Sequence, residues 1–225
     1  MLAGEPLITR VIQRVQEHGL VDELVVATDS PMVAQVVERS SVRAVLTARG
    51  HLTGTDRVAE VAARDEFAGF DTIVNVQGDE PFVVREALAG AIDRVAQGDD
   101  VGTAAAPLDS ALAHDPARVK VVTDTRGRAL YFSRAAIPHR REDGEPSPRL
   151  YWQHLGLYAY TRATLRRWTT LEPSPAELAE RVEQLRALHH GRRIGVALLA
   201  EPVEPGVDTP DDLRRAEAHW HALQR

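Results

Sequence analysis

Asp71-Thr72-Ile73-Val74-Asn75-Val76-Gln77-Gly78-Asp79-Glu80-Pro81 is the stretch that decides the fold. Its first half is apolar and β-branched, which is typical of a strand buried in a parallel sheet. Pro81 ends this run, and a helical pattern begins at about Val84. The stretch therefore predicts a buried strand, a polar turn at Gln77-Gly78-Asp79, and then a helix.

The polar turn is the first candidate for a functional site. In an open α/β sheet, ligands bind beyond the carboxyl ends of the strands. Gly78 would let a ligand approach the backbone closely, and Asp79 offers the hard oxygen that Mg²⁺ prefers. The alternative is a turn that is merely polar, with Asp79 and Glu80 favouring the N-terminus of the next helix. The residue types alone leave both interpretations open.

Strand and helix patterns alternate on both sides of this turn. Upstream, we expect helices and strands in turn at residues 5–18, 24–29, 30–37, 42–47 and 54–64, and downstream at 84–98 and 101–107. Such alternation is typical of an α/β protein with a doubly wound, mostly parallel, Rossmann-like sheet. Thr53 and Asp56 have the spacing of a capping box at the start of the 54–64 helix, with Asp in place of the usual Glu.

The pattern changes after Ala117. An antiparallel hairpin is predicted for residues 119–132, and the charged segment 139–149 is predicted to be a mobile loop. The remaining elements are a strand at 155–160, a helix at 162–168, a helix opened by a Ser174–Glu177 capping box with Leu178, Val182, Leu185 and Leu188 inward, a strand at 194–199, and a last helix capped at Thr209. We expect one domain over residues 1–225, with a strand-rich insertion at about 118–160.

Composition limits the possible functions. The 225 residues are 44% hydrophobic, enough for the core of one sizeable domain. A net charge of −6 disfavours a nucleic-acid partner. The absence of cysteine excludes disulfides and thiolate chemistry and fits a cytoplasmic location. No apolar run approaches the roughly 20 residues of a membrane span, and no secretory signal pattern is present, so we expect no membrane partner.

Seven short motifs occur in a fixed order along the chain. They are residues 54–57 (GTDR), 75–81 (NVQGDEP), 119–122 (VKVV), 131–134 (YFSR), 154–158 (HLGLY), 183–186 (EQLR) and 206–210 (GVDTP). This series resembles the CMP-Kdo synthetases, the 3-deoxy-manno-octulosonate cytidylyltransferases of lipopolysaccharide biosynthesis, over nearly the whole chain. The resemblance implies a Mg²⁺-dependent reaction of CTP with Kdo, a sugar acid, that gives CMP-Kdo and pyrophosphate.

The resemblance also implies roles for particular residues. Asp79 and Asp208 would be the metal carboxylates, and Lys120 would join them as a catalytic residue. Nucleotide binding would fall to Gly54, Thr55, Arg57, Gln77 and Gly78. The sugar acid would be lined by Gln77, Arg134, His154, Tyr158, Glu183 and Gln184, among which Arg134 suits a carboxylate. The family also implies a homodimer built partly from the second half of the chain.

These motifs also have plain structural interpretations. Asp208 alone would be an ordinary residue before the Thr209 cap, and Arg57 a solvated residue at a helix start. His154 and Tyr158 share one face of a strand because side chains alternate, and both could belong to the core. Lys120 could be a solvated hairpin lysine. Glu183 and Gln184 could simply lie at a helix edge.

The chain departs from the family at its beginning. Family members start with a strand and a phosphate-binding loop, whereas residues 2–7 match only the segment that follows. The first central strand would then be missing, which leaves costly unpaired strand edges. We therefore expect the 225-residue chain to be poorly active and poorly stable. One explanation is a misplaced or shortened start, which the presence of all the internal motifs in order favours. The other is a degraded or inactive relative.

Two other functions stay open. The chain could be a cytidylyltransferase for another sugar acid, such as an amino-substituted Kdo or a sialic acid. It could also be an inactive, truncated nucleotide-binding remnant.

Overall fold

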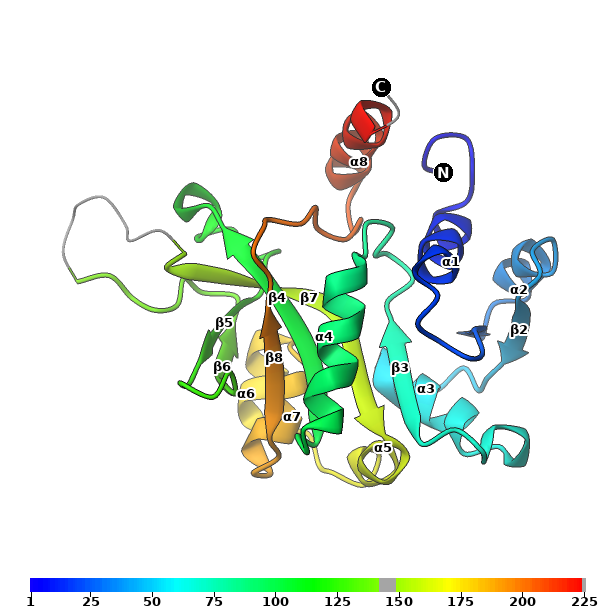
Figure 1. Cartoon of the computed structure of the whole chain (residues 1–225), viewed down its shortest axis with the longest axis horizontal. Helices are drawn as coiled ribbons and strands as arrows, with labels where there is room; N and C mark the ends of the chain where they lie inside the picture. The colour runs from blue at the N-terminus through cyan, green and yellow to red at the C-terminus, as the bar shows by residue number, and fades with distance from the viewer. Residues whose placement is uncertain (142–148, 224–225) are drawn as a thin grey trace. The chain divides into compact units, whose positions relative to one another are not determined.

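The computed structural model describes residues 1–141 and 149–223, which form two compact units (Figure 1). The first comprises Met1–Gly69, Asn75–Arg85 and Glu204–Arg225, and the second comprises Phe70–Val74 and Glu86–Val203. Most of the predicted loop at 139–149 lies outside the described residues. None of the described helices combines the length and the apolar character needed to cross a bilayer.

The first unit contains a parallel pair of short strands. β1 (Val25–Thr28) pairs with β2 (Arg43–Leu46), from Val25 opposite Arg43 to Thr28 opposite Leu46. The helices of this unit are α1 (Leu7–His18), α2 (Pro31–Val37), α3 (Gly54–Ala62) and α8 (Pro210–Leu223), with a 3-10 turn at Asp65–Phe67. Ile12, Val37 and Val42 form an apolar cluster of this unit. The predicted alternation of helix and strand is confirmed here.

The helix ends of the first unit follow from local sequence. The Ser30 hydroxyl accepts a hydrogen bond from the Val33 amide, with proline at the first helical position of α2. The Thr53 hydroxyl accepts from the Asp56 amide at 3.1 Å and donates to the Asp56 carboxylate at 2.9 Å. Gly19 ends α1 with a left-handed φ of 61°. The predicted cap at Thr53 is therefore confirmed.

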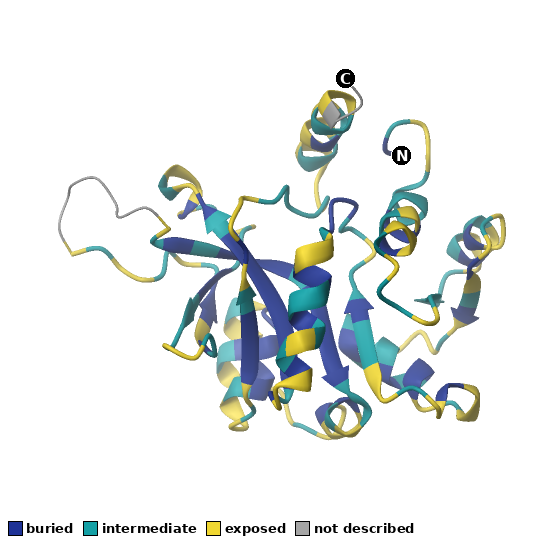
Figure 2. Cartoon of the chain, in the orientation of Figure 1, coloured by how far each residue is buried: buried dark blue, intermediate teal, exposed yellow. Residues whose placement is uncertain are grey.

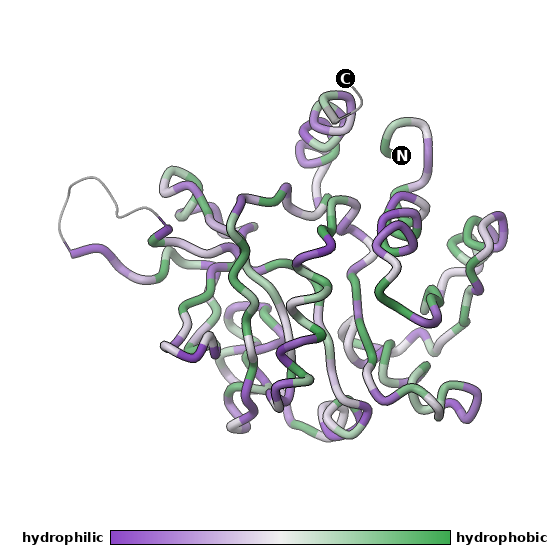
Figure 3. Tube along the Cα trace, in the orientation of Figure 1, coloured by the Kyte–Doolittle hydropathy of each residue, from purple (hydrophilic) through white to green (hydrophobic). Residues whose placement is uncertain are grey.

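The second unit is built on a sheet in the order β6-β5-β7-β4-β8, and β3 (Thr72–Val76) also pairs with β7. The other strands are β4 (Val101–Leu108), β5 (Lys120–Thr123), β6 (Ala129–Ser133), β7 (Tyr151–Thr161) and β8 (Ile194–Leu198), with a 3-10 turn at Ser110–Leu112. β4 is buried almost throughout (Figure 2), and the run of β8 is hydrophobic (Figure 3).

The α/β class and the β5–β6 hairpin are confirmed, but the sheet of the second unit is mixed rather than mostly parallel. β8 runs parallel to β4, whereas β7 runs antiparallel to both β4 and β5. β7 is also longer than predicted, because Gln153 at its polar beginning pairs with Ala106 and Lys120. The order of strands in the sequence does not reveal this direction of β7.

The helices of the second unit are α4 (Arg85–Ala96), α5 (Arg162–Trp168), α6 (Pro175–Glu180) and α7 (Gln184–His189). One long helix was predicted where α6 and α7 stand, and that prediction is wrong because Arg181 takes a left-handed φ of 54°. Leu178 was predicted to point inward but is 62% exposed, whereas Val182 and Leu185 are buried. The capping box of Ser174 and Glu177 is confirmed.

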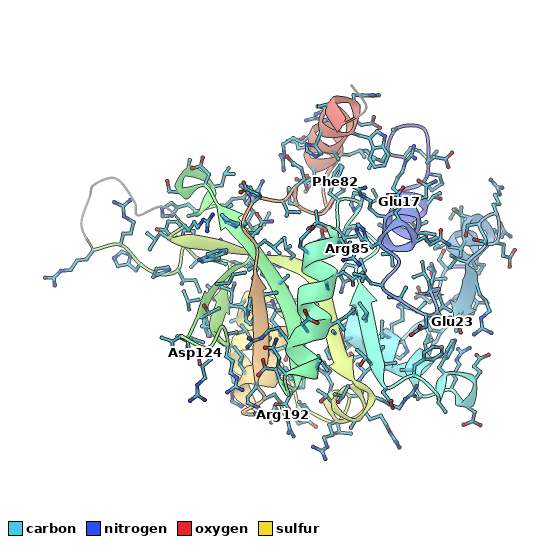
Figure 4. The ribbon with its side chains drawn as sticks, in the orientation of Figure 1. Glu17, Glu23, Phe82, Arg85, Asp124 and Arg192 are labelled. Atoms are coloured by element: carbon cyan, nitrogen blue, oxygen red, sulfur yellow. The ribbon has the colours of Figure 1, made fainter. Side chains whose placement is uncertain are left out.

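The turn of the β5–β6 hairpin returns to β8. The Val196 amide donates to the Gly127 carbonyl at 2.8 Å. Asp124, labelled in Figure 4, closes the turn by accepting from the Arg126 and Arg128 amides. Arg128 in turn contacts the buried Asp99 carboxylate, which also contacts Arg94 at 2.6 Å. This charged cluster of Arg94, Asp99 and Arg128 ties the hairpin to the sheet.

α4 packs so close to the sheet that only glycine fits at two contacts. A Cβ atom on Gly102 of β4 would lie 1.9 Å from the Ala91 carbonyl oxygen, and one on Gly90 would lie 2.5 Å from the Ala197 Cβ. Both distances are shorter than side-chain contacts allow. The glycines therefore set the distance between the helix and the strands.

Gly102→Ala is expected to destabilise the protein by about 2 kcal/mol or more, because the added methyl meets backbone that cannot move aside. Gly69→Ala is the matched control, since a Cβ there meets nothing within 4 Å. Urea unfolding followed by circular dichroism measures both. Equal midpoints for the two variants would contradict the close packing of α4.

Candidate active site

Two acidic segments far apart in the sequence meet in the first unit. Asp79 follows β3, and Asp208 lies just before α8. The Val207 amide donates to the Asp79 carbonyl at 2.8 Å. A Cβ on Gly206 would lie 3.1 Å from that same carbonyl oxygen and 3.3 Å from the Glu80 carboxylate. The segment before Asp208 therefore runs directly against the turn that carries Asp79.

The electrostatics of this pair are unusual for surface carboxylates. Burial of Asp79, followed by its hydrogen bond to the Asp208 carboxyl and the charge of that carboxyl, raises the pKa of Asp79 to about 6. The repulsion between two like charges this close is removed either by a shared proton or by a bound cation. No group of three or more His, Cys, Asp or Glu side chains that could hold a metal ion occurs among the described residues. Two carboxylates suit Mg²⁺, which commonly takes one or two of them and completes its shell with phosphate oxygens and water.

The segments that carry the two acidic residues pack on one apolar cluster of the first unit. Leu2, Phe82 and Ala216 are its buried members. Phe82, which follows Asp79 closely in the chain, meets the His219 ring of α8 edge-on at 4.9 Å. Arg10 stacks over Trp220 at 4.4 Å. Packing of α8 against this cluster therefore holds the start of α8, and with it Asp208, near Asp79.

The Gln77 side chain lies over the first turn of α3. A Cβ on Gly54 would lie 3.0 Å from the Gln77 amide nitrogen, and Thr55 is fully buried. Gln77 follows β3 and Gly54 begins α3, so the structure brings these two predicted nucleotide-binding residues together. Backbone N–H groups at such a helix start can bind anionic groups.

Arg57 is not the solvated residue of the plain interpretation. Its guanidinium donates to the Thr47 hydroxyl at 2.5 Å and lies 3.4 Å from the Asp29 carboxylate. Asp29 and Thr47 directly follow β1 and β2. Asp29 and Thr47 were not predicted as partners of Arg57. Like Asp79, each is a polar residue at the carboxyl end of a strand, so the rule that identified Asp79 applies to them as well.

The loop before α3 is held by Glu60. Its carboxylate accepts from the Ala48 amide at 2.9 Å and contacts the His51 ring at 2.5 Å. The hydrogen bond to His51 is the main reason that the pKa of Glu60 falls to about 2. This contact fixes the segment that leads into Gly54.

In the second unit, His154 is buried and neutral. Burial lowers its pKa to about 3. The Thr103 hydroxyl, which has one hydrogen, donates it to the Leu157 carbonyl at 2.7 Å, so its 2.9 Å contact with His154 Nε2 requires the ring to be the donor. The proton therefore resides on Nε2, and Nδ1 is the hydrogen-bond acceptor of the ring.

Tyr158 connects His154 to α7. The two rings lie 5.3 Å apart, as expected for residues on one face of β7, and the Tyr158 hydroxyl donates to the Gln184 side-chain oxygen at 3.0 Å. Glu183 directly precedes α7. The structure thus brings together the predicted sugar-side residues His154, Tyr158 and Gln184.

Lys120 and Arg134 both donate hydrogen bonds to main-chain carbonyls. Lys120 is fully buried, and its ammonium donates to the carbonyls of Asp115, Arg118 and Arg134, which uses its three N–H groups. Burial lowers the pKa of this ammonium. The solvated lysine of the plain interpretation is wrong, and a direct contact with substrate would require Lys120 to give up a carbonyl.

The Arg134 guanidinium binds the carbonyls of Pro116, Glu180 and Arg181. An arginine has five N–H donors, so these three contacts leave two for a ligand. Arg134 and Lys120 together hold the 115–118 segment and the end of α6 to β6. Their roles in a reaction stay predictions.

Comparison with known proteins agrees with this picture. A family model described as cytidylyltransferase matches residues 1–194. The chain is 51% identical to the 3-deoxy-manno-octulosonate cytidylyltransferase of Gemmatimonas aurantiaca, over 99% of this chain and 87% of that one. It is 46% identical to the enzyme of the same name from Methylococcus capsulatus, over 97% and 88% of the two chains.

Solved structures extend the comparison. CMP:2-keto-3-deoxy-manno-octonic acid synthetase complexed with CTP superposes with a TM-score of 0.88 at 36% identity, over 99% of this chain and 90% of that one. 4-Diphosphocytidyl-2C-methyl-D-erythritol synthase from Anaerococcus prevotii superposes with a TM-score of 0.63 at 15% identity, over 100% of this chain and 92% of that one, and shows only a shared fold.

The chain belongs to the cytidylyltransferase family. Its relatives place it, within that family, among the 3-deoxy-manno-octulosonate cytidylyltransferases, as the seven motifs predicted.

The raised pKa of Asp79 predicts how stability depends on pH in metal-free buffer. The folded pKa of about 6 lies above the ordinary 3.8, so the folded chain binds this proton more tightly than the unfolded chain. The associated stability is complete below about pH 4 and is lost as the pH rises through about 6. Asp79→Asn removes the charge, so at about pH 8 this variant should be more stable than the parent by roughly 1–2 kcal/mol.

Urea unfolding at about pH 4 and about pH 8 measures this difference, which should vanish at the lower value. Asp211→Asn is the control, because Asp211 is an exposed acid in the first turn of α8, the helix that follows Asp208. A pH-independent effect of Asp79→Asn would contradict the repulsion between the two carboxyls.

Proposed function

We propose that this chain transfers the cytidylyl group of CTP to 3-deoxy-manno-octulosonate, releasing pyrophosphate and forming CMP-Kdo for lipopolysaccharide biosynthesis. The observation that carries the proposal is the meeting of Asp79 and Asp208, two carboxyls that repel each other unless a proton or a cation lies between them. The names of the relatives and their high identity support the choice of CTP and of this sugar acid.

In the reaction, the anomeric hydroxyl of the sugar acid attacks the α-phosphorus of CTP. The new P–O bond forms as the bond to the pyrophosphate oxygen breaks. Such a transfer depends on positioning and charge neutralisation more than on covalent help from the protein. Asp79 and Asp208 would hold Mg²⁺, whose positive charge neutralises the phosphates when it is bound.

On the nucleotide side, α3 begins at Gly54, where the backbone N–H groups of a helix start would face an anionic group of the nucleotide. Gln77 lies over the first turn of this helix and offers an amide to a base or a phosphate. Arg57 is held in place by Asp29 and Thr47 rather than free to reorient. A preorganised donor set of this kind reduces the entropy cost of binding.

On the sugar side, the polar groups are held by buried contacts. The acceptor nitrogen of His154 suits a sugar hydroxyl, because its other nitrogen already donates to Thr103. Tyr158 and Gln184 are held by their mutual hydrogen bond. The two remaining N–H groups of Arg134 suit the sugar carboxylate.

A homodimer that uses residues 118–160 is part of the proposal. β6 lies at the end of the strand order of its sheet, and Leu130 on it is 63% exposed. Exposed apolar residues on an edge strand are typical of a surface that pairs with another chain.

Pyrophosphate release is the direct test of the activity. Protein mixed with CTP, Mg²⁺ and Kdo is expected to release pyrophosphate and form CMP-Kdo, and EDTA should stop the release. Replacing Kdo by a sialic acid should reduce the rate strongly. Absence of release from folded protein that still binds CTP would overturn the proposal in favour of a nucleotide-binding remnant.

Asp79→Asn and Asp208→Asn should each lower turnover by about a hundredfold or more, because each removes one of the two carboxylates that would hold the metal. Far-UV circular dichroism should stay unchanged. Asp211→Asn, a neighbouring acid paired with Arg214 on the surface, should retain the parental rate. Parental turnover in Asp79→Asn would remove Asp79 from the metal site.

A further inference from the structure

A buried ion pair joins α6 to α7 and has no part in the chemistry described so far. The Arg186 guanidinium donates to both oxygens of the Glu177 carboxylate, with Nε at 3.0 and 3.1 Å and Nη2 at 2.6 Å. The two side chains are 6% and 8% exposed. Neither residue is predicted to touch nucleotide, metal or sugar.

An ion pair this deeply buried fixes the relative position of its two side chains more reliably than it increases the free energy of unfolding. Desolvation of two charges offsets much of their attraction, so a buried pair is weak evidence for a gain in stability. Its remaining lone pairs and protons must also be satisfied. Here the Glu177 carboxylate also accepts from the Ser174 amide at 3.2 Å, which completes the capping box of α6. The carboxylate is thus held from two directions.

The pair spans the bend between the two helices. α6 ends at Glu180 and is capped by Arg181, whose left-handed backbone turns the chain and whose amide donates to the Glu177 carbonyl. α7 then begins at Gln184, two residues before Arg186. Because Glu177 lies in the first turn of α6, the contact to Arg186 closes the bend. The position of Gln184 relative to α6 follows from this closure.

Two further contacts connect the bend to the sugar-side residues. Gln184 accepts from the Tyr158 hydroxyl at 3.0 Å. The Glu180 carboxylate, at the end of α6, accepts from the Ser133 hydroxyl at 2.7 Å and from the Arg134 amide at 2.9 Å. The bend therefore lies in one network with Arg134, Tyr158 and Gln184.

We propose that Glu177 and Arg186 are positioning residues for the sugar acid. Their ion pair sets the bend that presents Gln184 and Glu183, and it acts on sugar binding without acting on the nucleotide. The inference rests on the proposed function. It assigns the pair a role in the affinity for the sugar acid rather than in the affinity for CTP or in general stability.

The test compares Michaelis constants in variants of the pair. Glu177→Gln keeps the shape and the bond to Ser174 but removes the charge, and Arg186→Met removes the guanidinium. Each is expected to raise the KM for Kdo by about ten- to a hundredfold, because small displacements of positioned groups cost this much. The KM for CTP should change by less than about twofold. Arg186→Lys should rescue the KM for Kdo only in part, because an ammonium cannot make the bidentate contact.

Arg94→Met is the matched control. It removes an arginine from another buried carboxylate of the same unit, Asp99, with no contact to the predicted sugar residues. It should lower the melting temperature and leave both Michaelis constants unchanged. Circular dichroism checks the folding of every variant, and if Arg186→Met fails to fold, Glu177→Gln decides the outcome.

A parental KM for Kdo in folded Glu177→Gln, or equal increases in both Michaelis constants, would overturn the inference. Absence of pyrophosphate release by the parent protein would instead overturn the proposed function. The two failures are therefore distinguishable in the same assay.

Discussion

The meeting of the Asp79 and Asp208 carboxyls is the constraint on which the candidate site depends. Burial of Asp79 and its repulsion from Asp208 raise the pKa of Asp79 to about 6, so an ionised Asp79 is destabilising in the folded chain. The packing of Phe82 and Ala216 in one apolar cluster maintains this contact. A strained acidic pair kept in place by hydrophobic packing is typical of functional sites, where ligand binding relieves the unfavourable charge.

Buried charge organises the second unit as well. Lys120 is satisfied by three carbonyls, Asp99 by two arginines, and Glu177 by Arg186 and the Ser174 amide. Each group would be costly if left alone, so each forces particular loops and helices to stay near the sheet. The predicted sugar residues lie among these contacts. The polar interior therefore limits how their side chains can be arranged.

Features that depend on neighbouring residues could be predicted from the sequence, whereas contacts between residues far apart in the chain could not. The caps at Thr53 and Ser174 were predicted because each involves residues within one helical turn. The break between α6 and α7 was missed, because Arg181 carries no glycine or proline signal for its left-handed backbone. The direction of β7 was also missed, since strand pairing depends on residues tens of positions away.

The sequence by itself determined the family, the order of most helices and strands, and the identity of the two acidic segments, because motifs and periodicity are properties of neighbouring residues. Only the tertiary structure decided that Asp79 meets Asp208, that Asp29 and Thr47 hold Arg57, and that Lys120 is buried against three carbonyls. Burial and hydrogen-bond partners arise from long-range packing, which sets the dielectric surroundings and the free donors of each side chain. The chemistry that a residue can perform is therefore decided only when the chain has folded.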